Sequence, residues 1–271
     1  MSSELSYPKS KVNKVNRLAD RGKYDCKTVH EILMASPVVH VSFNPGSPEE
    51  YPVILPMIGK LGSFENPSAD LSEPLDLYLH GYVSSRIMNV ARKAAQGEGE
   101  ADATPLKICV CATKVDGLVL SLTPNSHSMN YRSSVIFGTV ELVMDAEEKL
   151  YAMKLITDGV LPGRYDDTRI PPDSAEMQST QILKVTIDHA SAKIRTGEPG
   201  DYEKDLKRDD VRAKVWTGIV PIYQAFGEPQ VASYNRVDKV PGYISNYIKE
   251  TGDAEKEYAL TAIQKASAGK S

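Results

Sequence analysis

The sequence predicts a mainly β protein whose strands form an antiparallel barrel crossed by a few helices. At least six stretches alternate apolar with polar residues, and the stretch at 181–195 shows this most clearly. Two or three helical stretches interrupt the strands without alternating with them, which argues against a doubly wound parallel sheet. Pro52, Pro56 and Gly138 fall inside strand patterns, as expected at the edges and bends of a curved sheet.

The composition is that of a chain with an ordinary folded core. Of the 271 residues, 41% are hydrophobic and 25% are charged, which suits one large domain or one medium domain with extensions. The net charge of -4 argues against nucleic acid or an anionic membrane as the main partner. No stretch approaches the roughly 18 apolar residues of a membrane span, and no secretory signal is visible.

The cysteines form a sparse and odd set, Cys26, Cys109 and Cys111. They predict a reducing, cytoplasmic setting without structural disulfides. The chain has no CxxC, HExxH or other Cys/His cluster with metal-ligand spacing, so no metal site is predicted. It also lacks the GxGxxG and GxxxxGK[ST] patterns of common nucleotide-binding loops.

The first elements are a helix and two strands. Asp25 caps an expected helix over 26–35, with His30 on its polar side. Residues 38–43 form a β-rich strand, and 51–58 form a second one that its prolines confine to an edge, an end or a bulge. Such an irregular strand could offer free backbone groups to a ligand, or it could be an ordinary edge.

A strand, a turn and a helix are expected over residues 75–91. Leucines alternate with polar residues until Gly81, and Ser84 and Ser85 stand where the helix begins. A helix start carries unpaired N–H groups and partial positive charge, so the two hydroxyls and Arg86 would complete a binding site for a phosphate. The alternative is a serine that only caps the helix, followed by a solvated arginine.

A hairpin is expected over residues 106–123. Its strands alternate in period 2, and Asp116 and Gly117 have the composition of a tight turn. The acidic stretch at 97–105 before it reads as an exposed linker.

The next elements are two long strands and the helix between them. Residues 131–144 form a strand that bends at Gly138, Asp145 caps a helix over 146–160, and 181–195 return as a strand. The resulting division is a polar N-terminal arm at 1–24, a barrel domain at 25–230 that ends with an apolar stretch at 215–225, and a polar extension at 231–271 with a weak helix near 253–266.

A second polar cluster precedes and opens the strand at 131. It comprises His127, Asn130, Tyr131, Arg132, Ser133 and Ser134. Arg86 and Arg132 could bind one phosphate if their strands are neighbours in the barrel, or across a dimer. A surface salt bridge is the alternative for each arginine taken singly.

Six segments carry a resemblance to a known family. They are SPVVHVSF, YPVILPM, LYLHGYVSSRIMNVA, VDGLVLSLT, HSMNYRSSVIFGTVELVMDAEEK and VWTGIVPIYQAFGEP. In this order they resemble flavin-nucleotide-binding proteins of the pyridoxamine-phosphate-oxidase-like, FMN-binding split-barrel superfamily, and most of all the branch named for 5-nitroimidazole resistance. The resemblance covers roughly residues 22–230. It implies a six-stranded split barrel, a homodimer, and FMN in a groove between the subunits.

The resemblance also implies site residues. The phosphate would be held by His80, Ser84, Ser85 and Arg86, with a second group formed by Asn130, Tyr131, Arg132 and Ser133. The backbone of the second strand, at Val53, Leu55 and Met57, would meet the flavin ring. Family members commonly carry Gly and Lys or Arg after the histidine turn, where this chain has Ser-Ser-Arg, so the phosphate contact would fall to Arg86.

Three further residues are candidates near the expected groove. His80 and His127 could orient a small substrate, hydrogen-bond the flavin or deliver a proton, or they could be strand histidines satisfied by backbone. Trp216 could stack on the flavin, or pack in the core or a dimer contact.

These observations predict an FMN-dependent oxidoreductase that acts on a small molecule with a nicotinamide donor. Two alternatives remain open: a flavin-binding carrier without turnover, and a split barrel that uses haem or a deazaflavin.

Overall fold

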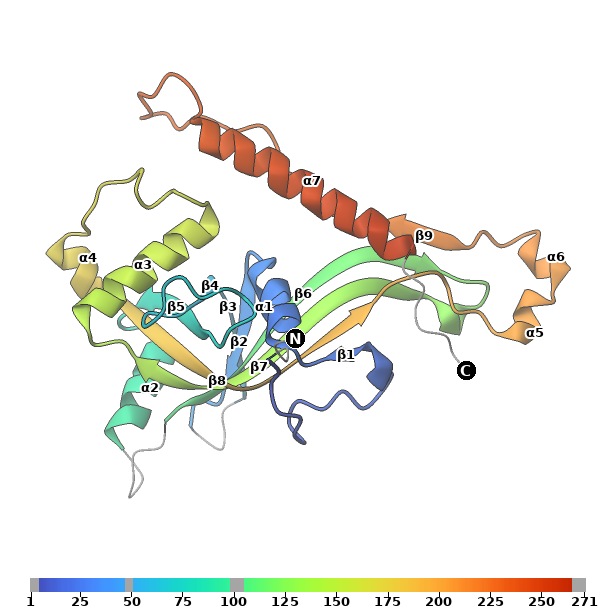
Figure 1. Cartoon of the computed structure of the whole chain (residues 1–271), viewed down its shortest axis with the longest axis horizontal. Helices are drawn as coiled ribbons and strands as arrows, with labels where there is room; N and C mark the ends of the chain where they lie inside the picture. Colours follow the sequence, from blue (N-terminus) through green and yellow to red (C-terminus); the bar gives the residue numbers. More distant parts are fainter. Residues whose placement is uncertain (1–4, 47–50, 98–104, 265–271) are drawn as a thin grey trace. The chain divides into compact units, whose positions relative to one another are not determined.

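A computed structural model describes residues 5–46, 51–97 and 105–264 (Figure 1). The chain forms two compact units. Unit 1 comprises residues 1–113 and 133–193, and unit 2 comprises residues 114–132 and 194–271. Almost all of the linker expected at 97–105 lies outside the described residues.

The strands form one mainly antiparallel sheet in the order β3-β2-β6-β7-β8-β5-β4, with β1 paired to β8 and β9 paired to β6. The strands are β1 (Gly22–Lys23), β2 (Val39–Phe43), β3 (Val53–Met57), β4 (Gly59–Gly62), β5 (Asp76–Tyr82), β6 (Lys107–Leu120), β7 (Ser128–Leu142), β8 (Thr180–Arg195) and β9 (Gly218–Pro221). The helices are α1 (Cys26–Met34), α2 (Arg86–Gln96), α3 (Ala146–Val160), α4 (Ser174–Ser179), α5 (Glu203–Leu206), α6 (Asp209–Arg212) and α7 (Gly242–Gln264). Short 3-10 turns lie at Ala19–Arg21 and Pro124–Ser126.

The predicted fold class is confirmed. Strands β3 and β4 are separated only by Ile58 and lie at the two ends of the sheet order, so together they act as one bent strand at which the barrel is split. Counted in this way, β2, β3/β4, β5, β6, β7 and β8 are the six strands of a split barrel. The short strands β1 and β9 are additions to it.

The core of unit 1 includes the contact between the barrel and α3. Tyr78 of β5, Ile182 of β8 and Ile156 of α3 belong to one buried cluster. As predicted, Asp145 caps α3, and its carboxylate accepts a hydrogen bond from the Glu148 N–H at 2.8 Å. This cap fixes where the helix begins beside β4 and β5.

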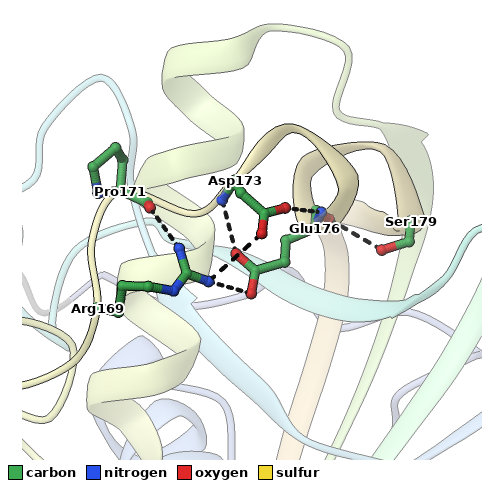
Figure 2. A network of polar contacts seen from close by, with 5 residues as sticks. All are labelled: Arg169, Pro171, Asp173, Glu176 and Ser179. Atoms are coloured by element: carbon green, nitrogen blue, oxygen red, sulfur yellow. Dashed lines mark hydrogen bonds and ion pairs between the residues drawn. The ribbon is translucent and has the colours of Figure 1, made fainter.

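The entry into β8 is fixed by a second cap, which Figure 2 shows. Asp173 and Glu176 form a reciprocal capping box at the start of α4, with distances of 2.9 and 2.8 Å. Arg169 bonds the Glu176 carboxylate and, at 3.2 Å, the Pro171 carbonyl. Because α4 leads directly into β8, the cap sets the point at which that strand begins.

The prediction of a hairpin at 106–123 is wrong. Strand β6 runs without a turn from Lys107 to Leu120, and Gly117 pairs with Pro221 of β9. A Cβ at Gly117 would lie 3.1 Å from the Val220 carbonyl oxygen, so the close approach of β9, rather than a turn, favours glycine at this position. Asp116 is buried in a salt bridge.

Residues 5–24, which the sequence suggested as a solvated arm, make specific contacts within unit 1. The buried Asn13 donates to the Ala190 carbonyl at 2.7 Å. The Tyr7 hydroxyl lies 2.6 Å from Nε2 of His30, whose Nδ1 lies 2.9 Å from the Leu71 carbonyl. His30 is therefore fully buried rather than on a polar helix face, and burial lowers its pKa. In the C-terminal region, α7 is a 23-residue helix, longer than the weak helix expected at 253–266.

The Gly138→Ala substitution is expected to destabilise the protein by about 1–3 kcal/mol, the usual cost of overpacking. An added Cβ would overlap the Thr186 carbonyl oxygen of β8, so the two strands would have to move apart. The free energy of unfolding in urea measures the effect. Gly227→Ala is the matched control, because a Cβ there meets nothing within 4 Å. Equal stability of the two variants would contradict the tight β7–β8 contact.

Candidate cofactor site

The start of α2 is the first candidate site. Ser85 is the N-cap residue, with extended backbone angles, but its side chain makes no capping hydrogen bond. Its Oγ is buried and has no hydrogen-bond partner among the described residues. The first N–H groups of a helix also lack intrahelical acceptors, so the helix start offers backbone donors in addition to this hydroxyl. This arrangement is suited to an anion with several oxygen acceptors.

Two residues that the sequence analysis missed hold the turn before α2. Arg92 donates to the Val83 carbonyl at 3.1 Å and to Oδ1 of Asn89 at 2.8 Å. Asn89 in turn donates to the Ser84 carbonyl at 3.0 Å. The carbonyls of the turn are thus engaged by helix side chains. The i,i+3 spacing of Asn89 and Arg92 was the available sequence signal.

The charge at this helix start is unusual. The first turn of α2 contains no acidic residue and begins with Arg86, which is exposed. A cation at the positive end of a helix is unfavourable by roughly 0.3–1 kcal/mol at an exposed site. A bound anion would reverse the sign of that interaction, so the local electrostatics favour a phosphate here.

The edge of β3 is the second candidate region. Among the described strands, β3 pairs only with β2, where Pro56 lies opposite His40. Val53, Leu55 and Met57 are half-buried on one face of this edge strand. The prediction of an edge is confirmed, and the other side of the strand has no strand partner in the described chain. Its backbone groups can therefore hydrogen-bond a planar ligand.

His80 lies in β5 opposite Ile182, before the turn into α2. The side chain is exposed, yet enough protein surrounds the ring that burial lowers its pKa. The imidazole is therefore neutral near pH 7 and can both accept and donate a hydrogen bond.

The second predicted cluster lies largely in unit 2, where Arg132 is engaged inside the protein. Its Nε and Nη2 donate to the two Asp116 carboxylate oxygens at 3.1 and 2.8 Å, and its guanidinium lies 3.4 Å from the centre of the Tyr258 ring. Burial raises the pKa of Asp116, which the Arg132 guanidinium opposes. These contacts do not support the expectation that Arg86 and Arg132 share one phosphate.

Other members of this cluster also have internal partners. Asn130 is fully buried, donates to the Gly197 carbonyl at 3.2 Å and is bonded by Arg195. Nδ1 of His127 accepts the Ser121 N–H at 3.0 Å. In unit 1, the Ser133 hydroxyl donates to the Lys193 carbonyl at 3.2 Å.

The aromatic candidates are accessible. Tyr131 is half-buried, and Trp216 is 65% exposed, so Trp216 is not a core residue of the described chain.

The strand order and the chain path through β3 and β4 define a split barrel. Residues 25–194 match the family model of pyridoxamine 5′-phosphate oxidase. The chain belongs to this family, whose split barrel is a flavin-binding fold. None of the curated proteins compared with the chain matches it. Among the described residues, no helix has the length and apolar character that crossing a membrane requires.

Several solved structures have similar folds. The flavocytochrome Anf3 from Azotobacter vinelandii is 26% identical, with a TM-score of 0.70 over 88% of this chain and 96% of the other. The FAD and haem binding protein from Mycobacterium smegmatis is 24% identical, with a TM-score of 0.65 over 83% and 96%. A candidate 5-nitroimidazole antibiotic resistance protein from Bacteroides thetaiotaomicron is 20% identical, with a TM-score of 0.44 over 63% and 84%.

Removing the partner of Arg132 is expected to destabilise the protein. Asp116→Ala leaves a buried guanidinium without its carboxylate, which typically costs about 3–5 kcal/mol. Unfolding in urea measures the loss, and the double variant Asp116→Ala/Arg132→Met should recover part of it. Asp210→Ala is the matched control, since it breaks an exposed Arg208–Asp210 pair and should change nothing measurable. An Asp116→Ala protein as stable as this control would contradict a structural role for the pair.

Proposed function

We propose that the chain binds a flavin nucleotide, FMN, at the start of α2 and along the edge of β3, and that it is an oxidoreductase. The observation that carries the proposal is the buried Ser85 hydroxyl without a partner among the described residues, at the N-terminus of an 11-residue helix. A buried hydroxyl without a hydrogen-bond partner destabilises the folded protein, and a ligand atom that accepts its hydrogen bond removes this cost. A phosphate oxygen is such an acceptor.

In this proposal each element has one task. Ser84, Ser85 and the first N–H groups of α2 donate to the phosphate, and Arg86 supplies positive charge. The unpaired edge of β3 hydrogen-bonds the rim of the flavin ring. When bound, the flavin supplies hydride and electron transfer, and the protein supplies position and electrostatics.

His80 is proposed to face the substrate side of this site. Because burial lowers its pKa, it is neutral near pH 7 and can hydrogen-bond a small substrate or carry a proton without a fixed charge. The 65% exposure of Trp216 leaves its indole accessible, so we keep it as a proposed aromatic contact for a flavin in a homodimer.

The second candidate function is a protein that binds both a flavin and haem. The similarity to the flavocytochrome favours it, because 88% of this chain is covered at 26% identity with a TM-score of 0.70. That coverage necessarily reaches past residue 194, where the family match ends. A flavin-binding carrier without turnover is the remaining alternative.

The Ser85→Ala variant is expected to raise the Kd for FMN about three- to tenfold, since one hydrogen bond of about 0.5–1.5 kcal/mol is lost. Quenching of FMN fluorescence during titration of the apoprotein measures the Kd, with FAD titrated in parallel. Ser134→Ala is the matched control, because its hydroxyl is also buried without a partner in the described chain but lies within β7. Equal Kd values for the two variants would remove the assignment.

NADH or NADPH is expected to reduce the flavin on the protein. When either is added without oxygen to the FMN-loaded protein, the visible flavin absorbance should bleach faster than that of free FMN at the same concentration. Stopped-flow absorbance measures the two rates. A loaded protein that bleaches no faster than free FMN would favour the carrier.

A further inference from the structure

Residues 227–240, between β9 and α7, form an exposed arm of unit 2 (Figure 1). The arm has neither helix nor strand, and every residue in it is exposed. A connection of this length without regular structure is uncommon in a compact protein and is usually functional. The hydrogen bonds that the arm makes in the described chain stay within it; the Asn235 side chain, for example, donates to the Val237 carbonyl at 2.7 Å. They do not attach the arm to any other element.

Large apolar side chains occupy every third position in the middle of this arm. Val231, Tyr234, Val237 and Val240 are 72, 87, 62 and 41% exposed. The residues between them are mostly polar or charged. Single exposed apolar residues need no explanation, whereas four uncovered ones in one short segment indicate a surface that a partner covers.

Both ends of the arm are held by unit 2. Before the arm, Gln224 accepts a hydrogen bond from Nζ of Lys114 at 2.8 Å, and the Phe226 ring lies 5.6 Å from the Tyr247 ring of α7. After the arm, the Lys114–Glu255 ion pair at 2.8 Å holds α7 to β6. Because its two ends are fixed, the arm loses less conformational entropy on binding than a free chain end would.

Unit 1 has an exposed apolar face on β2 and β3. Ile54 of β3 is 63% exposed, and Pro56, on the same face of the strand, is also exposed. Val38 and Tyr51, just before the two strands, are 40 and 90% exposed. Among the described strands β3 pairs only with β2, so this face lies at the border of the sheet, where a second chain can reach it.

We propose that the partner is a second copy of this chain, and that the arm of each subunit packs on the β2–β3 face of the other. The resemblance given above implies a homodimer but not the surfaces that join its subunits. A second copy covers both the arm and the face, whereas an unrelated partner would have to match only one of them. A two-fold axis buries both arms and both faces at once. The proposal uses only exposed side chains and does not depend on the flavin site.

The size of the two surfaces suits a stable dimer. Such an interface takes about 800 Å² and 20–30 residues from each subunit. The arm comprises residues 227–240, and residues 37–43 and 51–57 add the exposed side chains of the face. Together they reach the lower end of that range, which neither reaches alone. Tyrosine at the centre of the arm is also a residue type enriched in interfaces.

The first test is sedimentation equilibrium of the full-length protein without flavin. We expect a dimer with twice the chain mass of 29.7 kDa. Tyr234→Asp on the arm and Ile54→Asp on the face should each raise the dimer dissociation constant at least tenfold. Met144→Asp is the matched control, because Met144 is 81% exposed but belongs to neither surface. A monomeric unaltered protein, or a Tyr234→Asp dimer as stable as the control, would overturn the proposal.

The second test locates the contact in a protein without a charge substitution. The photoreactive residue p-benzoylphenylalanine replaces Tyr234, and nitrogen-15-labelled and unlabelled chains are mixed before illumination. We expect covalent dimers in which the arm of one isotope is joined to residues 37–57 of the other, as mass spectrometry of the peptides would show. Links only within one chain, or links to any other part of the second chain, would overturn the proposal.

Discussion

The open edge of β3 is the constraint on which the proposed site depends. Pro56 has no N–H to donate, so β3 cannot form a complete ladder on both sides, and in the described chain it pairs only with β2. The chain then continues through Ile58 into β4, which pairs with β5 from Gly59 opposite Leu79 to Gly62 opposite Asp76. A Cβ at Gly59 would lie 2.8 Å from the Leu79 side chain, so the two strands are in close contact at this point.

The start of α2, which follows β5 along the chain, is the second part of the proposed site. The helix begins with a cation, Arg86, at the end where its dipole favours an anion, and it leaves the Ser85 hydroxyl buried without a partner in the described chain. In a part of the protein selected only for stability, a capping side chain and an acidic first turn would be expected, as Asp145, Glu147 and Glu148 provide for α3. The start of α3 therefore has the features of a cap that stabilises the helix, whereas the start of α2 has the features of an anion-binding site.

The sequence predicted elements whose signals are local. The alternation in β8, the Asp145 cap and the edge character of β3 each depend on residues within one element. The Asp116-Gly117 turn failed because residues far along the chain decide the conformation there: Arg132 bonds the carboxylate, and β9 pairs with the glycine. Short turn signals lose to such long-range pairing, since a strand ladder and a buried ion pair outweigh turn propensity.

The same distinction between local and long-range signals applies to the candidate site residues. Ser85 and Arg86 could be chosen from sequence because a helix start is a local pattern, whereas the engagement of Arg132 by Asp116 and Tyr258 could not.

The overall charge of -4 is compatible with an anionic cofactor because phosphate binding is a local property. Exposed charges separated by more than about 8 Å are largely screened at physiological ionic strength, so distant acidic residues contribute little at the start of α2. What acts there are Arg86, the helix N–H groups and two hydroxyls, all within the first turn or just before it. Nucleic acid would instead require a basic surface over many phosphates, which a net acidic chain does not predict. One negative total thus argues against a polyanion as partner but not against a single nucleotide phosphate at the proposed site.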